Sequence, residues 1–141
     1  MKFVKIVETE KEIRKCFPVM AELRPHFTVE NEFLEQVKRQ IENDKFQLIF
    51  LDDNGVKAVG GIRIGEWLGC GKYLEIEDLV ATENERSKGY GGELFDWIVD
   101  YAKRENCNQI KLVSHVKRFA AHKFYLNKGM IIEAHYFSMT I

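Results

Sequence analysis

Residues 82–92 read TENERSKGYGG and lead directly into residues 93–104, ELFDWIVDYAKR, whose apolar residues have helical spacing. Gly89, Gly91 and Gly92 therefore stand where a helix is expected to begin. A glycine inside a helix costs about 1 kcal/mol relative to alanine, so three of them here need a physical reason.

The beginning of a helix is a natural site for an anion. Its first four amides lack partners within the helix and lie at the positive end of the helix dipole. Glycine lets a bulky anion approach these amides because no Cβ is in the way. Arg86 and Lys88 add positive charge at the same place. The stretch therefore predicts a phosphate-binding loop between a strand and a helix.

Two well-known phosphate-binding motifs do not fit the glycine spacing. A P-loop requires GxxxxGK[ST], but Gly92 is not followed by Lys-Ser or Lys-Thr. A dinucleotide-binding fingerprint requires GxGxxG, but Leu94 stands where the third glycine is needed. The spacing that the stretch does have is Arg-x-x-Gly-x-Gly, with Arg86, Gly89 and Gly91. A nucleoside triphosphate is thus a disfavoured ligand.

Length and composition limit the class of protein. A chain of 141 residues with 45% hydrophobic and 30% charged residues suits one globular domain, which we expect to cover residues 1–141. Twenty-one basic against twenty-two acidic residues argue against nucleic-acid binding. No apolar run is long enough for a bilayer and the N-terminus lacks a secretory signal, so we expect a cytoplasmic protein without a membrane partner.

The cysteines and histidines do not form a metal site. Cys16, Cys70 and Cys107 are odd in number and widely spaced, and no CxxC pair occurs. His26, His115 and His135 have no partners at the spacing of metal ligands. We therefore expect neither a disulfide framework nor a bound metal.

The periodicity along the chain predicts an α+β fold with a mixed, mostly antiparallel sheet flanked by helices. Thr9 and Glu12 form a candidate capping box, Pro18 is expected to kink or split the helix that follows, and Asn54-Gly55 is typical of a hairpin turn. Strands are expected at residues 2–7, within 46–66 as a hairpin, and at 72–82, 109–115 and 130–141. Helices are expected at residues 11–24, 29–44, 91–106 and 117–129.

Two stretches resemble one known family. Residues 77–102, EDLVATENERSKGYGGELFDWIVDYA, resemble the acetyl-CoA-binding segment of the GNAT superfamily of N-acetyltransferases, with its [Gln/Arg]-x-x-Gly-x-[Gly/Ala] signature. Residues 120–130, AAHKFYLNKGM, resemble the family's later helix, through Phe124, Tyr125, Gly129 and Met130. The expected element order is also similar to the GNAT fold. The chain departs from the family at Arg118, where an asparagine is common.

The resemblance implies acetyl-CoA as co-substrate. It implies that backbone groups of three consecutive residues hold the pantetheine arm, namely Leu79, Val80 and Ala81. It also implies that the glycine loop holds the pyrophosphate, with Arg86, Ser87, Lys88, Gly89, Tyr90, Gly91 and Gly92, and that Tyr125 lies at the cofactor.

Direct transfer of an acetyl group to an amine needs a base, because an alkyl ammonium has a pKa of roughly 10.4. Strand alternation puts Glu75 and Glu77 on one face and Asp78 on the other, unless a bulge intervenes. By resemblance Glu77 is the first candidate for the base and Asp78 the second. The resemblance further suggests that the main-chain amide of Val80 polarises the thioester carbonyl.

Tyr125 is the candidate acid for the leaving thiolate. Arg118, His122 and Tyr125 follow at spacings of four and three, so they share one helix face. A tyrosine of pKa about 10 is a weak acid, but a thiolate of pKa about 8.5 needs only a hydrogen bond or a late proton. His122 either orients this tyrosine, touches the cofactor or serves packing.

The acceptor is expected to be a primary amine of a small molecule or peptide. By resemblance it lies opposite the cofactor, among candidates that include Phe27, Glu30, Trp67, Glu77 and Tyr136. The acidic residues in this region are compatible with a polyamine, while an amino acid, an aminoglycoside or a protein N-terminus stays open.

Two further expectations concern the whole molecule. A non-catalytic module that binds acyl-CoA as a sensor or interaction partner would share the glycine loop and is the alternative to an enzyme. A strand at residues 133–141 would be exposed, which is compatible with a homodimer.

Overall fold

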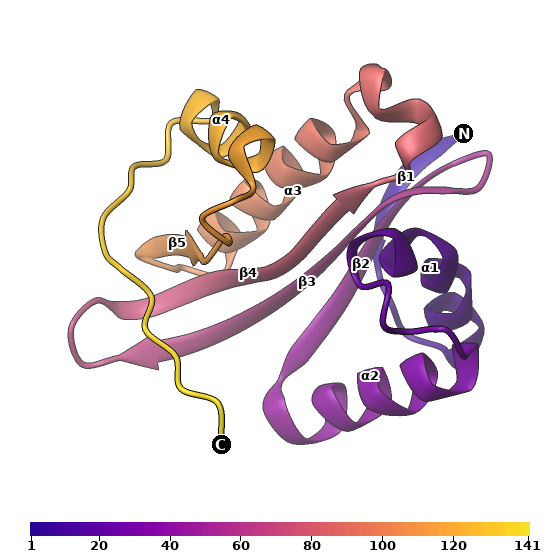
Figure 1. Ribbon diagram of the computed structural model, residues 1–141, viewed down its shortest axis with the longest axis horizontal. Helices are drawn as coiled ribbons and strands as arrows, with labels where there is room; N and C mark the ends of the chain where they lie inside the picture. The colour runs from indigo at the N-terminus through magenta and orange to yellow at the C-terminus, as the bar shows by residue number, and fades with distance from the viewer. The chain divides into compact units, whose positions relative to one another are not determined.

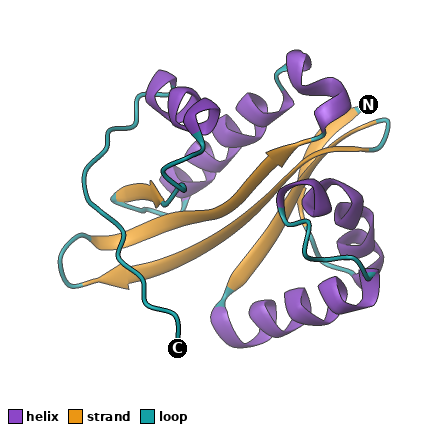
Figure 2. Ribbon diagram, in the orientation of Figure 1, coloured by secondary structure: helices purple, strands orange, loops and turns teal.

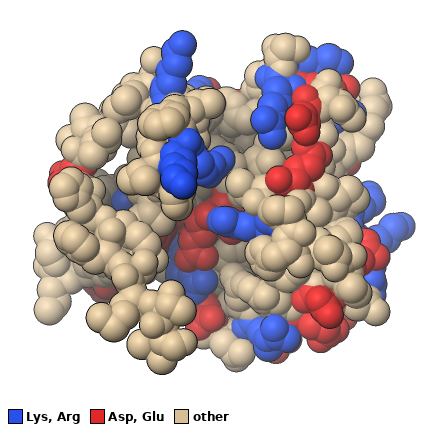
Figure 3. All heavy atoms as spheres, viewed as in Figure 1, with Lys and Arg blue, Asp and Glu red and all other residues tan.

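The computed structural model describes residues 1–141, which form two compact units, Met1–Lys111 and Leu112–Ile141. Figures 1 and 2 show their helices and strands. Acidic and basic side chains both occur over the face drawn in Figure 3, in keeping with the nearly balanced charge. None of the helices combines the length and the apolar character that a membrane span requires.

The first unit is built on an open sheet with the strand order β1-β2-β3-β4-β5, in which the first three pairings are antiparallel. A β4–α3–β5 crossover, the connection that parallel strands need, supplies the fourth neighbour. The predicted mixed α+β fold is confirmed. The elements are β1 (Lys2–Ile6), α1 (Glu10–Leu23), α2 (Glu30–Asp44), β2 (Phe46–Asp53), β3 (Val56–Trp67), β4 (Gly71–Ala81), the 3₁₀ segment η1 (Glu83–Lys88), α3 (Tyr90–Arg104) and β5 (Gln109–Leu112).

Helices cover both faces of this sheet (Figure 1). Helices α1 and α2 share a buried apolar cluster with β2, to which Phe33, Val37 and Phe50 belong. On the opposite face, Leu94 and Ile98 of α3 are fully buried and lie next to Gly60 of β3. Successive residues of a strand alternate between the two faces, so one face of β3 and β4 meets α1 and α2, and the other meets α3.

Local sequence signals explain where several elements begin and end. The predicted capping box is present, since Thr9 Oγ1 accepts from the Glu12 amide and the Glu12 carboxylate accepts from the Thr9 amide. The predicted hairpin turn is also present, with Asn54 and Gly55 at positive φ. Both are short-range effects of the side chains or of glycine, which is why the sequence reveals them.

Pro18 does not split α1, so of the two predicted effects, a kink or a split, the split is wrong. The helix runs through Pro18 and stays helical to Leu23. Pro18 is exposed, so its ring, which cannot donate to the Arg14 carbonyl, lies on the solvent side of the helix. The helix ends at Leu23. Arg24, the residue before Pro25, has φ −118° and ψ 71°, because the proline ring disfavours helical geometry in the residue that precedes it.

A β-bulge interrupts the pairing of β3 with β4. Gly61 is opposite Asp78, but the next residue, Ile62, is opposite Ile76, so Glu77 is the extra residue on β4. The bulge reverses the alternation of side chains from Asp78 onward. Val80, two residues further along, belongs to the apolar cluster under α1 and α2, so Asp78 lies on that face as well.

The second unit contains one helix, α4 (Phe119–Asn127), followed by a segment without regular structure. The closing strand predicted at residues 130–141 is absent, as the loop colour in Figure 2 shows. Apolar side chains such as Ile132 and Phe137 are largely exposed there. Alternating apolar residues make a strand only when a neighbouring backbone supplies hydrogen bonds, and the sequence pattern cannot specify that neighbour.

The close packing at the bulge can be tested by a substitution at Gly61. A Cβ at this position would overlap the Asp78 carboxylate and lie 2.6 Å from the Phe46 ring. We expect Gly61→Ala to lower the free energy of unfolding by about 1 to 3 kcal/mol, because the Asp78 carboxylate and the Phe46 ring must both shift from their packed positions. Urea unfolding followed by circular dichroism measures this. Gly60→Ala is the matched control, since its Cβ would make only contacts of 3.4 Å or more. Equal losses in the two variants would contradict the assigned crowding.

Candidate active site

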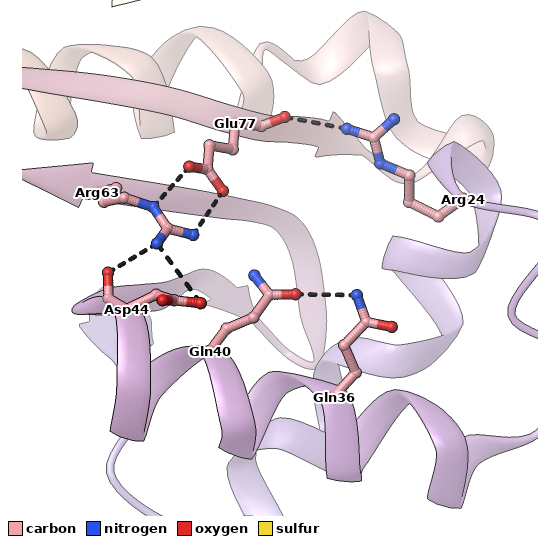
Figure 4. A network of polar contacts seen from close by, with 6 residues as sticks. All are labelled: Arg24, Gln36, Gln40, Asp44, Arg63 and Glu77. Atoms are coloured by element: carbon pink, nitrogen blue, oxygen red, sulfur yellow. Dashed lines mark hydrogen bonds and ion pairs between the residues drawn. The ribbon is translucent and has the colours of Figure 1, made fainter. Parts of the chain in front are cut away.

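Glu77, the extra residue of the bulge, is held by an arginine on the neighbouring strand. Arg63 Nε lies 2.7 Å from Glu77 Oε2 and its Nη2 lies 3.2 Å from Oε1, so both carboxylate oxygens are engaged. Arg63 also donates to the carbonyl of Asp44 at the end of α2, at 2.7 Å (Figure 4). The Glu77 side chain is therefore fixed as one partner of a two-point ion pair.

Asp78 is held by a second arginine, from the end of α1. Arg24 Nε lies 2.9 Å from Asp78 Oδ1, and Arg24 Nη2 donates to the Glu77 carbonyl at 3.0 Å (Figure 4 shows the latter contact). Burial raises the pKa of the Asp78 carboxyl above its usual range, while the Arg24 charge opposes this rise. Asp78 Oδ2 has no hydrogen-bond partner. One oxygen of a half-buried carboxylate is thus left available to a ligand.

A cavity of about 120 Å³ lies beside Asp78, between the ends of α1 and α2 and the sheet. Its polar groups are few, and two of them, Gln36 and Gln40, are one turn apart on α2 and hydrogen-bonded to each other at 3.0 Å (Figure 4). The lining residues are Met20, Arg24, His26, Phe27, Phe33, Gln36, Val37, Gln40, Phe46, Leu48 and Asp78. The site thus combines an apolar wall with one half-buried carboxylate, one guanidinium, one imidazole and two amides.

Sequence reasoning found part of this cavity. Phe27 and Asp78, both predicted as site residues, line it. Arg24 and His26 lie within three residues of Phe27 and also line the cavity, but the sequence does not single out either of them. An arginine and a histidine before a helix match no motif of defined spacing. Arg24 is recognised as a site residue only from its ion pair with Asp78 in the structure.

The other predicted acceptor residues of the first unit do not line the cavity. Glu30 pairs with Arg14 on α1 at 3.2 Å. Trp67 packs against Tyr73 at the far end of the β3–β4 hairpin, with the Lys111 amine over its ring. Tyr136 belongs to the second unit and is 72% exposed. Within the first unit, Phe27 is therefore the one predicted acceptor residue that lines the cavity, and Glu77 is bound to Arg63.

Beyond the bulge, one edge of β4 has no neighbour within the first unit. The Thr82 amide donates to the Lys57 carbonyl of β3 at 2.8 Å, so alternation turns the Val80 backbone groups toward β3 and those of Leu79 and Ala81 away from it. Strand β5 starts beside Lys72 and has only four residues, so it ends well before Leu79. Leu79 and Ala81 thus present unpaired N–H and C=O groups.

The glycine loop after β4 is fastened at three points. Glu22 of α1 accepts from the Glu83 amide at 2.8 Å, where the loop begins. Lys57 pairs with Glu85 at 2.9 Å in the middle of the loop. The Tyr90 hydroxyl donates to Asp53 Oδ2 at 2.7 Å at its end, which raises the pKa of Tyr90 to about 12. Glu83 and Glu85 precede the predicted phosphate ligands and Tyr90 contributes only its side chain, so the loop is held without using Arg86 or the glycines.

The remaining loop residues face solvent. Arg86 and Ser87 are exposed, and Lys88 is exposed with a 3.3 Å contact to Glu85. Gly89 has φ +79°, which glycine adopts without strain, and no side chain caps the α3 helix that follows. The Tyr90 side chain is buried, so its backbone alone can meet a ligand. An open strand edge followed by an uncapped helix start with cations suits an extended, amide-bearing chain that ends in a diphosphate.

Tyr125 and its predicted neighbours lie in the second unit. His122 Nε2 lies 2.9 Å from the His115 carbonyl oxygen, and the His122 amide donates to the Arg118 carbonyl, so His122 fastens the loop before α4. This geometry favours the packing role among the three that were open for His122. Burial raises the pKa of the Tyr125 hydroxyl, while the Arg118 charge opposes the rise. The hydroxyl therefore stays protonated at neutral pH. No cluster of three or more histidine, cysteine or carboxylate side chains could hold a metal ion.

Comparisons with known proteins agree with this geometry. The model of the acetyltransferase (GNAT) family matches residues 7–130. An uncharacterized N-acetyltransferase of Bacillus subtilis, YhdJ, is 32% identical over 136 residues, which is 95% of each chain. The aminoalkylphosphonate N-acetyltransferase of Salmonella typhimurium is 32% identical over 63 residues, 45% of this chain and 38% of that protein.

Solved structures extend the comparison to the fold. A putative acetyltransferase from Agrobacterium tumefaciens has a TM-score of 0.85 at 17% identity, with 99% of each chain covered. At that identity the likeness concerns the fold alone. Together with the family match over most of the sequence, these findings establish that the chain belongs to the GNAT family of acetyltransferases.

Proposed function

We propose that this protein transfers an acetyl group directly from acetyl-CoA to the primary amine of a small acceptor bound in the cavity beside Asp78. The observation that carries the proposal is the adjacency of two features along β4. Asp78 ends the bulge with one free carboxylate oxygen, and Leu79 begins the open strand edge. A donor lying along that edge and an amine lying in the cavity would meet at this point of the strand.

We propose Asp78 as the base, ahead of Glu77. Asp78 lines the cavity and keeps one oxygen free, whereas both oxygens of Glu77 are bonded to Arg63. Burial raises the pKa of Asp78, which makes it a better proton acceptor than an ordinary aspartate once it is ionised. In this role Asp78 Oδ2 takes the proton of the ammonium group, so that a neutral amine attacks the thioester carbonyl.

The backbone amide that polarises the thioester carbonyl is better assigned to Leu79 than to Val80. The Val80 backbone faces β3, where its N–H belongs to the ladder, while the Leu79 N–H is on the open edge. Acetyl-CoA supplies the acetyl group as an activated thioester. The chain supplies a fixed N–H donor toward the carbonyl oxygen, the group on which negative charge develops. The Leu79 and Ala81 edge would hold the pantetheine arm.

The remaining roles follow the family resemblance. Arg86, with the amides at the start of α3, would bind the diphosphate, and Ser87 and Lys88 lie beside them on the same exposed loop. Tyr125 would donate a hydrogen bond or a proton to the leaving sulfur. The family match spans residues 7–130, across both units, which supports treating them as one acetyltransferase domain. The name of the Salmonella relative supports a small amine as the acceptor class.

Cofactor binding can be measured without an acceptor. We expect acetyl-CoA to raise the midpoint of thermal unfolding, because a ligand that binds only the folded state stabilises it. Arg86→Gln should reduce this shift, because it removes a cation from the diphosphate site. Arg14→Gln is the matched control, since Arg14 pairs with Glu30 away from the loop. An undiminished shift for Arg86→Gln would remove Arg86 from the cofactor site.

Thiol release from acetyl-CoA with a panel of amines tests the transfer reaction itself. We expect turnover that Asp78→Asn lowers by about 10² to 10⁴-fold, with little change in acetyl-CoA affinity. Glu77→Gln should keep more activity than Asp78→Asn. The rate should fall as the pH is lowered through the pKa of Asp78, because the base must be ionised. This decrease on the acid side of the pH–rate profile should be absent in Asp78→Asn. Tight acetyl-CoA binding without turnover for any amine would instead support a non-catalytic acyl-CoA sensor.

Tyr125→Phe tests the acid role in the same assay. We expect turnover to fall by about 10²-fold while acetyl-CoA affinity changes little, because only the hydroxyl is removed. Since burial raises the pKa of Tyr125, the wild type should show no loss of rate from its ionisation below about pH 10. Tyr136→Phe, a change at an exposed tyrosine of the same unit, is the control. Equal turnover of Tyr125→Phe and wild type would exclude the acid role.

A further inference from the structure

We propose that the acceptor is a small zwitterionic amine, one that carries a carboxylate or phosphonate within two or three bonds of the amine carbon, and that Arg24 recognises this negative group. The inference rests on the proposed function and names the substrate class of the same cavity. It follows from the charges, the free hydrogen-bond donors and the size of the cavity.

The charges of the cavity disfavour a polycation. Asp78 is the sole carboxylate among the lining residues, and Arg24 already neutralises it. Glu77, next to it on the strand, is neutralised by Arg63. Glu30, an expected contributor to an acidic surface, pairs with Arg14 outside the cavity. A polyamine would therefore find no net negative charge here and would meet the Arg24 guanidinium instead.

Arg24 has donors to spare. Its Nε and Nη2 atoms bind Asp78 and the Glu77 carbonyl, while Nη1 has no partner. The Arg24 side chain is 41% exposed and lines the cavity, so a ligand can reach it. Planar guanidinium donors bind carboxylates and phosphonates in short, charge-assisted hydrogen bonds. A ligand with its amine at Asp78 Oδ2 and its anion at Arg24 Nη1 would extend the existing ion pair into four alternating charges.

The anion of the acceptor would also support the chemistry. When Asp78 takes up the proton of the amine, Arg24 loses its counter-charge in a half-buried site. A carboxylate or phosphonate on the acceptor replaces that charge. A nearby negative charge also favours the protonated form of Asp78, which is the form the proton transfer produces. The negative group is therefore expected to raise kcat as well as to lower KM.

The size of the cavity indicates how much of the acceptor it can enclose. Its volume is about 120 Å³, with Phe27, Phe33 and Phe46 in the wall. A dry protein cavity of about 150 Å³ accommodates benzene, so a side chain of roughly four or five carbons fits here. An aminoglycoside is much larger than this. The cavity thus suits a short amino acid or aminoalkyl acid with an apolar body.

Matched pairs of acceptors test the inference. Leucine is compared with 3-methylbutylamine, and 2-aminoethylphosphonate with ethylamine, since the members of each pair differ in the anion. We expect the acid-bearing member to have a kcat/KM about 10 to 100-fold higher, with part of the gain in kcat. The ratio between leucine and 2-aminoethylphosphonate shows which anion Arg24 prefers. Spermidine should be a poorer substrate than either acid.

Variants then assign the preference to Arg24. Arg24→Met should abolish the difference within each pair, Arg24→Lys should keep part of it, and Arg14→Met should keep all of it. Should Arg24→Met fail to fold because Asp78 is left unpaired, Arg24→Lys decides, since it keeps the charge and loses the fork of donors. An unchanged preference in Arg24→Lys would overturn the role of Arg24.

Binding separates this inference from the proposed reaction. Calorimetric titration of leucine and 3-methylbutylamine into the protein saturated with coenzyme A requires no transfer step. Leucine should bind at least about tenfold more tightly, and Arg24→Lys should reduce the difference. Equal binding of the two ligands, or equal turnover within the pairs, would overturn the inference while leaving acetyl transfer intact. Absence of turnover with preferential leucine binding would overturn the proposed reaction and leave the recognition by Arg24 standing.

Discussion

The β-bulge at Glu77 is the constraint on which the rest of the site depends. One extra residue on β4 turns Asp78 onto the face that α1 and α2 cover, next to Glu77 rather than opposite to it. Without the bulge, alternation would direct Asp78 toward α3 and its apolar side chains. Gly61 makes the arrangement sterically feasible, because the Asp78 carboxylate occupies the space that a Cβ would fill. The same register shift turns the backbone of Leu79 to the open edge.

Two carboxylates side by side in a half-buried strand repel each other and lose hydration, so each needs a counter-charge. Arg63 binds Glu77 at two points from the adjacent strand, and Arg24 binds Asp78 from the end of a helix. The two pairs are not equivalent. The first uses both carboxylate oxygens and the carbonyl of Asp44, whereas the second leaves an oxygen of Asp78 and a nitrogen of Arg24 available. This difference makes the Arg63–Glu77 pair a structural ion pair, whereas the Arg24–Asp78 pair can still bind a ligand and react.

The donor side of the site is made of backbone rather than side chains. Strand β5 is short, so Leu79 and Ala81 keep unpaired groups, and the glycine loop continues the same line of donors to the start of α3. Contacts from Glu22, Lys57 and Asp53 hold this loop in place. A loop that is fastened before the ligand arrives loses less conformational entropy on binding, which suits the recognition of a flexible co-substrate.

The sequence by itself determined the features that depend on neighbours in the chain. The helix with its capping box, the Asn54-Gly55 turn, the glycine loop before α3 and the GNAT family all follow from residue types at short spacing. The tertiary structure alone decided the continuity of α1 through Pro18, the missing terminal strand and the register that bulges at Glu77. Strand pairing depends on which backbones meet. A shift of one residue in the pairing register moves each side chain to the other face of the sheet, and the residue pattern of a single strand does not reveal such a shift. For this reason the sequence identified Glu77 and Asp78 as candidates, and their pairing with Arg63 and Arg24 distinguished the two carboxylates.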